Sequence, residues 1–370
     1  LLAAKHINEA GGVLGKEVKI VTRDTKTDPT SGVDAAKKLV NVDGVSAYIG
    51  ALSSGVSMPI AESVSIPNEV VQISPSSTTP LMTDLEDNGY VFRTVPSDAL
   101  QGVILGQLAI DEGYKSMSVV YVNNDYGKGL ADSTSGWFEE QGGEVYAKVP
   151  YAKGKASYRG ELNQATRKNP EVLVIVGYPE NGAKIVRQSI SEGFATNFLF
   201  PDGMKAPELV ENVGAKYLNG TLGTAPGSTD TPSAKIFRES YTAEYGKTPP
   251  KPFIDTAYDA AVVISLAMAK AGTSDSQGIR ENLRYVAAPP GEEVFAGVDG
   301  LKKALRLIEE GKDINYEGAG GSVDFNEDGD VISPVIVWKI EDGKIVTVRT
   351  ERTAFAEGRF VPKKVLEDQE

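Results

Sequence analysis

Two segments rich in Ser and Thr carry the side chains of this sequence with the most evident chemistry. Residues 50–55 and 74–80 each follow a predicted β-strand, at the point where open α/β sheets bind ligands. Their hydroxyls, free backbone N–H groups and a following helix N-terminus would suit a carboxylate. Ordinary helix capping by Ser and Thr explains the same residues equally well. The candidate ligand-binding residues of these segments are Ser53, Ser54, Ser76, Ser77 and Thr78.

Three other predicted strand ends have a different character. Tyr126, Tyr178 and Asp202 each come within a few residues of the end of a predicted strand, and they offer aromatic rings and one carboxylate. A ligand with a carboxylate at one place and an ammonium at another would fit between the two sets of residues. The sequence therefore predicts a binding site with one set of residues for a carboxylate and another set for an ammonium.

Motifs for other chemistry are weaker. Residues 324–330 imitate the start of a calcium loop, but the twelfth position is Val335 instead of a bidentate Glu, so a turn is favoured over an ion site. The Gly127–Gly129 pair lacks the third glycine of a dinucleotide fingerprint and places Asp132 where a pyrophosphate would lie. His6 is predicted to be a surface residue. No nucleophile–base pair is apparent, so the protein is not expected to be an enzyme.

Composition removes several further classes of function. The chain has 370 residues with no Cys and one His, which excludes disulfides, thiolate metal sites and a zinc site with two His ligands. With 38 basic and 51 acidic side chains, the formal net charge is −13. Such a negative surface repels phosphate backbones, so we expect no nucleic-acid partner. No metal or cofactor is expected, and no apolar run reaches the ~18–20 residues of a membrane helix.

Short β-rich runs alternate with helical stretches, which predicts an α/β fold with parallel sheets. The predicted strands are 18–22, 47–49, 70–73, 118–122, 145–149, 172–176 and 198–200. The helices predicted between and after them are 31–42, 58–64, 100–112, 129–141, 158–168, 182–192 and 207–213. Long helices at 232–245, 253–271 and 300–310 precede a hairpin of 335–340 and 344–348. From Thr350 the sequence becomes polar and is predicted to be a loose tail.

Seven segments, taken in order, resemble the branched-chain amino-acid binding proteins of ABC transporters, which are type I periplasmic solute-binding proteins. They are INEAGGVLGKEVKIVTRDTKTDP (7–29), YIGALSSG (48–55), ISPSSTTP (73–80), FRTVPSDALQG (92–102), VVYVNNDYGKGLA (119–131), FPDG (200–203) and YEGAGGSVDF (316–325). The resemblance spans the chain to about residue 350.

The resemblance implies roles for individual residues. Ser54 and Thr78 would hold the ligand's α-carboxylate, and the backbone carbonyl of Ser76 would accept from its ammonium. Tyr126 would close over the ligand from the opposite lobe, and Asp202 would face the ammonium, with a shorter reach than the Glu that is also found there. The remaining implied roles are a pocket-wall aromatic at Tyr178, a crossing residue at Asp98 and a contact with the ligand side chain at Tyr258.

The resemblance also implies the organisation of the chain. Two similar Rossmann-like lobes, each with a parallel-type central sheet, would be joined by a three-strand hinge near residues 95–98, 225–228 and 325–333. The first lobe would contain residues 1–97 and 226–328, the second lobe residues 98–225 and 329–350, and the tail residues 351–370. Family members begin with a strand before the first helix, so we expect that this strand is absent and that the sequence belongs to a longer protein.

The function implied is the extracytoplasmic solute-binding component of an ABC transporter, which captures an aliphatic, branched-chain or aromatic amino acid between two closing lobes. It would be a periplasmic or membrane-anchored monomer that delivers its ligand to a membrane permease. Two alternatives stay open at this point. The ligand could be an aromatic or other small carboxylate without an ammonium, or the chain could be the ligand-binding domain of a receptor.

Overall fold

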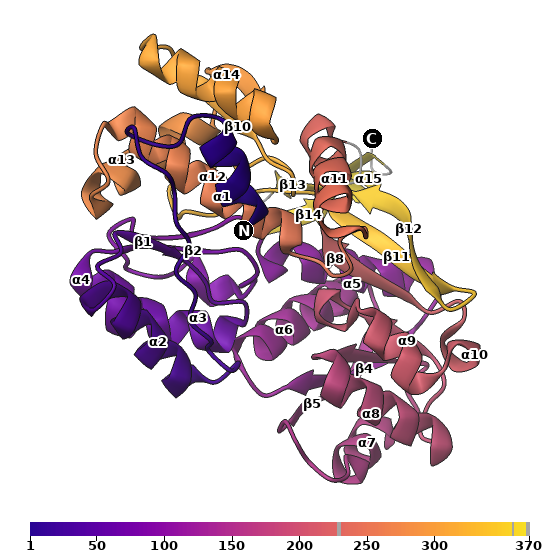
Figure 1. The fold of residues 1–370 in the computed structure, drawn as a ribbon. Coiled ribbons are helices and arrows are strands. Elements are labelled where there is room, and N and C mark those ends of the chain that lie inside the picture. Colours follow the sequence, from indigo (N-terminus) through magenta and orange to yellow (C-terminus); the bar gives the residue numbers. More distant parts are fainter. Residues whose placement is uncertain (228–230, 357–358, 368–370) are drawn as a thin grey trace. The chain divides into compact units, whose positions relative to one another are not determined.

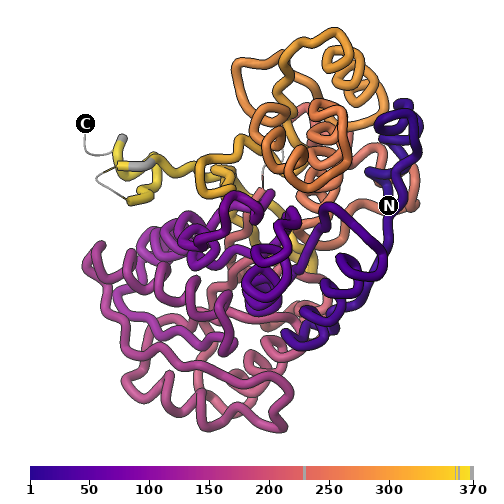
Figure 2. Tube along the Cα trace, turned by 90° about the vertical axis from the view of Figure 1, so that its left-hand side faces the viewer, coloured from indigo at the N-terminus to yellow at the C-terminus, as the bar shows by residue number. Residues whose placement is uncertain are grey.

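The computed structural model describes residues 1–227, 231–356 and 359–367 and contains two compact units (Figures 1 and 2). Unit 1 comprises Leu1–Ser97, Ser228–Pro249 and Phe253–Ser333, and unit 2 comprises Asp98–Gly227, Pro250–Pro252 and Pro334–Glu370. By this division the chain passes from one unit to the other at 97/98, 227/228 and 333/334, and again on either side of the short segment Pro250–Pro252. Residues 329–333 lie in unit 1, whereas the predicted boundary puts them in the second lobe. Ser228, at the end of the second predicted hinge segment, lies outside the described residues.

Unit 1 contains a parallel sheet in the order β1-β2-β3, formed by Ala47–Ile49, Val71–Ser74 and Val91–Arg93. Helix α2 (Pro29–Asn41) begins where the Asp28 carboxylate caps the Ser31 N–H at 2.8 Å. Helix α3 (Ser54–Ile60) starts after β1 and continues through a π-helical turn, η1 (Ala61–Ser65), into α4 (Ile66–Asn68). A short 3-10 helix, η2 (Pro80–Met82), follows the loop after β2. The two hydroxyl-rich segments therefore follow adjacent strands of one sheet.

The rest of unit 1 is mainly helical. Figures 1 and 2 show indigo α1 (Leu2–Glu9) beside orange α12 (Ile254–Ala271) and α14 (Val298–Glu309), and these helices are in contact. Their apolar faces form the main core of this unit together with α13 (Ser276–Ala287). The remaining elements are α11 (Pro232–Tyr245) and the parallel pair β9 (Glu292–Phe295) and β10 (Ile314–Glu317).

The prediction that His6 is a surface residue is wrong. His6 lies on the face of α1 that packs against α12, and its Nδ1 is 2.9 Å from the Tyr258 hydroxyl. Because that hydroxyl also accepts from the Gly297 N–H at 3.0 Å, its own proton is directed to Nδ1. Burial lowers the pKa of the His6 imidazole, so the neutral ring is favoured.

The strand predicted at 18–22 is also wrong. These residues are described without strand hydrogen bonding and are largely exposed, although Val18 is tied to Asn8 by two hydrogen bonds. Strand β1 pairs with β2 within the described sheet, and no described strand pairs with residues 18–22. A β-rich run without a partner strand has nothing to satisfy its backbone groups except solvent.

Unit 2 has a seven-stranded sheet in the order β12-β11-β8-β7-β6-β4-β5. Its parallel strands are β4 (Ser116–Val122), β5 (Glu144–Tyr151), β6 (Val172–Val176), β7 (Phe198–Phe200) and β8 (Leu222–Pro226). The antiparallel strands β11 (Val335–Glu341) and β12 (Lys344–Glu351) form the predicted hairpin. All five residues of β6 are buried, as expected of a strand covered on both faces.

Helices surround this sheet in the expected βαβ alternation (Figure 1). They are α5 (Asp98–Asp111), α6 (Asp125–Glu140), α7 (Arg159–Thr166), α8 (Pro179–Ser191), α9 (Pro207–Val213) and α10 (Ala215–Leu218), with a 3-10 turn η3 (Asp202–Met204). The α/β fold class with parallel-dominated sheets is confirmed.

The prediction of a loose tail is wrong for the described residues beyond Glu351. Strands β13 (Thr353–Ala356) and β14 (Arg359–Pro362) pair, and α15 (Lys363–Glu367) follows. Val361 packs with Val103 and Trp137, and the Arg359 guanidinium lies 5.5 Å from the centre of the Trp137 ring. A few apolar side chains are thus enough to fix a polar segment on α5 and α6.

The buried His6 predicts a pH-dependent stability. Since its pKa is lowered on folding, the unfolded chain binds the proton more readily below about pH 6.5. Stability should be fully present above that pH and fall as the pH decreases toward the folded-state pKa. Urea unfolding between pH 5 and pH 7.5 should show a smaller loss at low pH for His6→Gln, which cannot titrate there. An equal loss in both proteins would contradict the prediction.

Candidate ligand-binding site

In unit 2, the candidate residues gather at the carboxyl ends of three neighbouring strands. Strand β4 leads to Tyr126 in the first turn of α6, β6 leads to Tyr178, and β7 leads to Asp202. The Asn124 side chain caps α6 by accepting from the Gly127 N–H at 2.9 Å, which fixes the turn that carries Tyr126. Gly127 is required there, because a Cβ would lie 1.9 Å from the Val122 carbonyl oxygen.

Asp202 is held by two side-chain donors. The Tyr126 hydroxyl donates to Asp202 Oδ1 at 3.0 Å, and Gln101 Nε2 donates to the same oxygen at 2.9 Å. The carboxyl is 4% exposed. Burial raises the pKa of Asp202 to about 6, and the two hydrogen bonds act in the opposite direction. The result is a buried carboxylate with hydrogen bonds but without a cationic partner among the described residues of unit 2.

Tyr126 is locked in place from several sides. Its ring stacks on Tyr178 with centroids 5.7 Å apart, and its hydroxyl accepts from the Gly203 N–H at 3.2 Å. Gly203 permits this approach, since a Cβ there would lie 2.7 Å from the Tyr126 hydroxyl. Burial, followed by the neighbouring Asp202 charge, raises the pKa of Tyr126 well above its usual value. The phenol therefore stays neutral and remains a donor to the carboxylate.

Sequence reasoning missed two residues of this cluster, Gln101 and Thr224. Gln101 lies on α5, three residues after Asp98 and so on the same face of the helix. Its Nε2 also contacts the carbonyl oxygen and the hydroxyl of Thr224, both at 3.3 Å. Its place in the FRTVPSDALQG motif was the available signal. Asp98 itself is fully buried at the start of α5, directly after the first boundary between the units.

In unit 1, the hydroxyl-rich segments are brought together as expected. Ser53 and Ser54 lie at the N-terminus of α3, and the Ser54 hydroxyl accepts from the Thr79 N–H at 3.3 Å. The Ser77 hydroxyl donates to Ser57 Oγ at 2.7 Å, so Ser77 braces the two segments against each other. Thr78, between these contacts, is fully buried.

Two residues that sequence reasoning missed complete this bracing. The Ser57 hydroxyl accepts from the Ala51 N–H at 2.8 Å. The Ser74 hydroxyl donates to the Ala51 carbonyl at 2.7 Å and accepts from the Ser77 N–H at 2.9 Å. Both lie inside the quoted motifs or one helical turn beyond them, where the sequence does not distinguish a bracing hydroxyl from a binding one.

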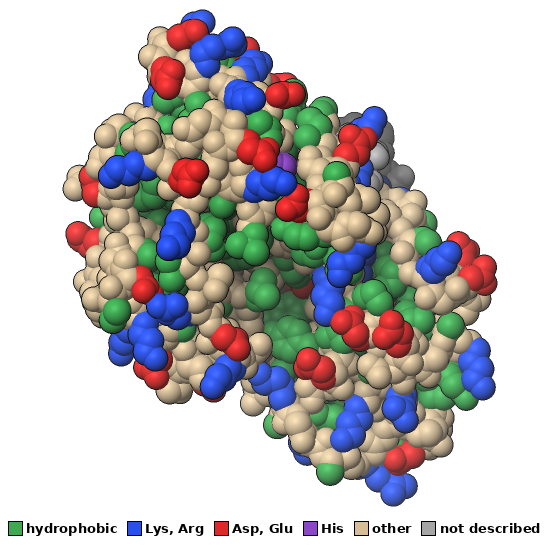
Figure 3. Space-filling model, viewed as in Figure 1, with side chains coloured by type: hydrophobic (Ala, Val, Ile, Leu, Met, Phe, Trp, Pro, Cys, Tyr) green, Lys and Arg blue, Asp and Glu red, His purple; other side chains and the backbone are tan. Residues whose placement is uncertain are grey.

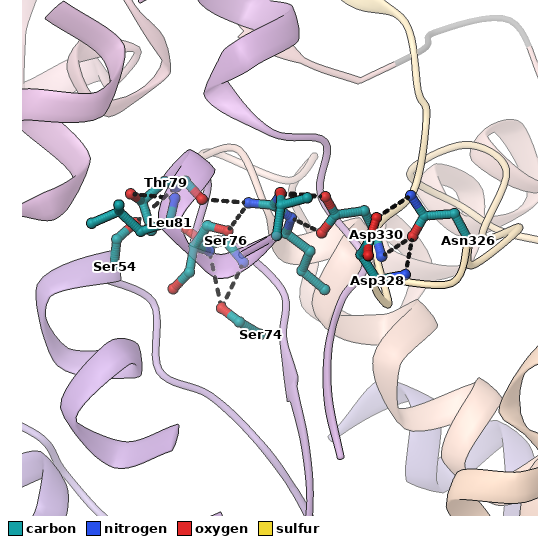
Figure 4. A network of polar contacts seen from close by, with 11 residues as sticks. Ser54, Ser74, Ser76, Thr79, Leu81, Asn326, Asp328 and Asp330 are labelled. Carbon is teal, nitrogen blue, oxygen red and sulfur yellow. Dashed lines mark hydrogen bonds and ion pairs between the residues drawn. The ribbon is translucent and has the colours of Figure 1, made fainter. Parts of the chain in front are cut away.

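A buried arginine supports the second hydroxyl segment (Figure 4). Arg93, at the end of β3, donates to the Thr79 carbonyl at 2.8 Å and forms a two-pronged ion pair with Asp330, with both distances 2.6 Å. Thr83 donates to the Asp330 carboxylate at 2.7 Å. The side chain of Arg93 is 0% exposed. The ion pair therefore connects the loop after β2 with residues 326–330, close to the end of unit 1.

Residues 324–330 form a turn, as favoured from the sequence. The side-chain Oδ1 of Asn326 accepts from the N–H groups of Asp328 and Asp330, both at 2.9 Å (Figure 4). The Asp330 carboxylate is occupied by Arg93, which removes it from any ligand set. Among the described residues, the structure contains no group of three or more His, Asp or Glu placed to hold a metal ion.

Tyr258 lies in the core of unit 1, where its hydroxyl bonds His6 and Gly297. Its contact with a ligand side chain stays a prediction. Ser76, by contrast, is only partly buried, and its backbone N–H lies 3.4 Å from the Ser74 hydroxyl.

The charged side chains on the surface do not gather by sign on the face shown in Figure 3, where Lys and Arg lie among Asp and Glu. None of the helices in the described part of the chain combines the length and apolar content that crossing a bilayer requires.

Comparison with known proteins identifies the class. The sequence profile of a family described as "Periplasmic binding protein" matches residues 1–344, so the chain belongs to this family of solute-binding proteins, which are not enzymes. A leucine-binding protein of Thermotoga maritima has the same fold, with a TM-score of 0.80 and 29% identity over 94% of this chain and 92% of its own.

Two curated relatives are similar over most of their length. A Leu/Ile/Val-binding protein homologue of Brucella melitensis is 30% identical over 76% of this chain and 75% of its own. A substrate-binding protein of a chemotactic signal transduction system in Halobacterium salinarum is 25% identical over 93% of this chain and 82% of its own. The resemblance to branched-chain amino-acid binding proteins is thereby confirmed.

The Arg93–Asp330 pair predicts a large stability difference between two acids of one loop. Asp330→Ala would leave the Arg93 guanidinium buried without its counter-charge, so unit 1 should lose about 3–5 kcal/mol of stability. Asp328→Ala, in the same turn but exposed, should change stability by less than about 0.5 kcal/mol. Urea unfolding of both variants checks this. Equal stability of both variants would show that the ion pair is dispensable.

Proposed function

We propose that this protein is the solute-binding component of an ABC transporter and that it captures an amino acid with an aliphatic, branched or aromatic side chain. Ser54 and Thr78, with the backbone N–H groups of their segments, would hold the ligand's α-carboxylate. Asp202 would accept from its ammonium, and Tyr126 and Tyr178 would cover the ligand. The two predicted lobes would close on it about the three-strand hinge.

The observation that carries this proposal is the state of Asp202. A carboxylate that is almost fully buried, with neutral donors and with no cationic partner in the described part of unit 2, is destabilised in its charged form, as its raised pKa indicates. A ligand ammonium would supply the missing charge, and a charge-assisted hydrogen bond in such surroundings contributes about 1.5–3 kcal/mol. The site therefore favours amino acids over plain carboxylates.

The relatives support the same ligand class. The Thermotoga maritima protein is described as leucine-binding and the Brucella melitensis protein as a homologue of Leu/Ile/Val-binding proteins. By the same analogy, the partner would be a membrane permease and the protein would act outside the cytoplasm, either periplasmic or anchored to the membrane.

Two other functions have a specific observation in their favour. With Asp202 protonated, its carboxyl carries no charge, and the hydroxyls of unit 1 would then serve an acid without an ammonium equally well. The Halobacterium salinarum relative belongs to a chemotactic system, so the captured ligand could be presented to a receptor instead of a permease.

Identification of the bound molecule tests the proposal most directly. Mass spectrometry of ligand released on denaturing the purified protein should find an amino acid, and a thermal-shift panel should agree. A ligand at 100 times its dissociation constant adds about 2.7 kcal/mol of stability. Stabilisation by aromatic acids but by no amino acid would instead support the second candidate.

Removal of the Asp202 carboxylate should remove the preference for an ammonium. Asp202→Ala should weaken amino-acid binding by ~100-fold, equivalent to about 2.7 kcal/mol. Asp132→Ala is a matched control in the same unit, since the Asp132 side chain is 42% exposed and paired with Lys128 and Lys148. Calorimetry should show unchanged affinity for the control. Unchanged binding by Asp202→Ala would refute the assigned role.

Amino-acid affinity should also depend on pH with a defined sign. Because the pKa of Asp202 is about 6, the carboxylate is lost as the pH falls through 6, while the ligand's own carboxylate stays ionised above roughly pH 4. Calorimetric affinity should decrease by up to about tenfold per pH unit below 6. Asp202→Asn, which cannot titrate, should give a flat profile over the same range.

A further inference from the structure

Gln101 occupies an unusual position beside Asp202. It is fully buried on α5, and its Nε2 makes all three of its hydrogen bonds, to Asp202 and to two oxygens of Thr224. Its Oε1 is buried without a hydrogen-bond partner among the described residues. A buried amide oxygen left unsatisfied is unfavourable, so some other requirement fixes the amide in this orientation.

The Thr224 carbonyl supplies that requirement. A backbone carbonyl oxygen can only accept, so it must face Nε2 instead of Oε1. The same carbonyl accepts from Trp338 Nε1 at 3.0 Å, which holds it in place from the other side. Since Nε2 also reaches Asp202 Oδ1, the amide presents a donor to the carboxylate even though its own oxygen stays unpaired.

The backbone of α5 is fixed as tightly as the amide. Gly102 and Gly106 lie against α6, and a Cβ at either position would collide, at 2.4 Å from Ser133 Cβ and 2.8 Å from the Thr134 carbonyl oxygen. Helix α6 carries Tyr126 on its first turn. The α5–α6 contact therefore sets the two donors to Asp202 Oδ1 relative to each other.

We propose that Gln101 is a positioning residue that keeps the Asp202 carboxylate ionised and fixed in orientation, and that it thereby determines the preference for ligands with a cationic group. Both side-chain donors end on Oδ1, which leaves Oδ2 without a side-chain donor among the described residues. In this arrangement Oδ1 accepts from the two side chains that orient the carboxylate, and Oδ2 is available to the ligand ammonium. The inference rests on the proposed function of Asp202.

Other titratable groups surround this cluster and must be considered in any titration. They are the hydroxyls of Tyr126 on α6 and Tyr178 before α8, and the carboxyl of Asp98 on α5, whose charges act on Tyr126. None of them is cationic, so the carboxylate of Asp202 depends on neutral donors. Tyr126 and Gln101 are its two side-chain donors, and hydrogen bonds from the backbone of Asp202 and Gly203 act in the same direction. Loss of one of the two side-chain donors should raise the pKa of Asp202.

The chain offers a matched control on the same helix. Gln107 is also buried on α5, donates to an Asp carboxylate (Asp111) at 2.9 Å and accepts from Trp137 Nε1 at 3.0 Å. Gln101→Met and Gln107→Met each remove one amide–carboxylate hydrogen bond at nearly constant volume. A general effect on α5 would appear in both variants, whereas the proposed effect appears in Gln101→Met alone.

Two measurements test the proposal on the full chain. The first is a carboxyl ¹³C NMR titration of Asp202 without ligand, in which Gln101→Met should raise the pKa and Gln107→Met should not. The second is calorimetry at pH 6.5 with leucine and with 4-methylpentanoate, which lacks only the amino group. Gln101→Met should lower the affinity ratio of leucine to 4-methylpentanoate about tenfold, whereas Gln107→Met should leave it unchanged.

The outcomes separate this inference from the proposed function. An unchanged Asp202 titration in Gln101→Met, or an equal loss of affinity for both ligands, would overturn the role of Gln101. A raised pKa with an unchanged affinity ratio would keep the positioning role and refute Asp202 as the ammonium acceptor. If Gln101→Met does not fold, Gln101→Asn, which withdraws the amide by one methylene, is titrated in its place with the same criteria.

Discussion

The structure of unit 2 depends on one electrostatic constraint, which is a carboxylate buried without a permanent counter-charge among the residues that the structure describes. Desolvation of Asp202 favours its neutral form, and only neutral donors oppose this. This constraint determines the positions of several other residues in the unit. Tyr126 must lie at the start of α6, Gly203 must lack a side chain, and α5 must approach α6 closely enough to bring Gln101 to the same oxygen.

Unit 1 buries a charge of the opposite sign, and that charge has its counter-ion within the protein. Its buried charge, Arg93, has a permanent partner in Asp330, and the Thr79 carbonyl and the Thr83 hydroxyl also accept from its guanidinium. Such a pair is stable without any ligand. It braces the hydroxyl-rich segment, and no role in contacting a ligand is proposed for it. Hydroxyls and backbone N–H groups are neutral, so they need no counter-ion when the site is empty. The proposed ligand, with a carboxylate for the neutral donors of unit 1 and an ammonium for the carboxylate of unit 2, therefore agrees with the groups that each unit offers.

Much of the fold was predictable from local sequence patterns. The predicted ranges 47–49, 172–176 and 198–200 coincide with β1, β6 and β7, and 207–213 and 232–245 coincide with α9 and α11. These elements combine apolar periodicity with nearby Gly or Pro. The strands β9 and β10 escaped prediction because half of their residues are polar, and α13 escaped although Asp275 caps it and apolar residues recur at 279, 283 and 286.

The errors share a physical cause. In each case the structure of the segment depends on contacts, present or absent, with residues far away in the sequence. His6 looks like a surface residue until Tyr258, 252 positions away, provides a hydrogen bond. The segment 18–22 looks like a strand but has no described partner, and the polar segment after Glu351 looks loose until Trp137 and Val103 cover its few apolar side chains. For the proposed site, the motifs could not separate Ser77, which braces the loop, from Ser54 and Thr78, which are proposed to bind the ligand, nor did they reveal Gln101.

Trp338 gives the molecule an internal optical probe. It is one of two tryptophans in the chain, it stacks on Phe200 at 6.3 Å, and its indole N–H donates to the carbonyl that orients Gln101. Indole emission responds to the hydrogen bond at Nε1 and to nearby charge, so its fluorescence is connected through three hydrogen bonds to the ionisation of Asp202. The other tryptophan, Trp137, bonds Gln107 and lies under Arg359, away from that chain of contacts. The protein thus contains both a reporter and its internal reference without any added dye.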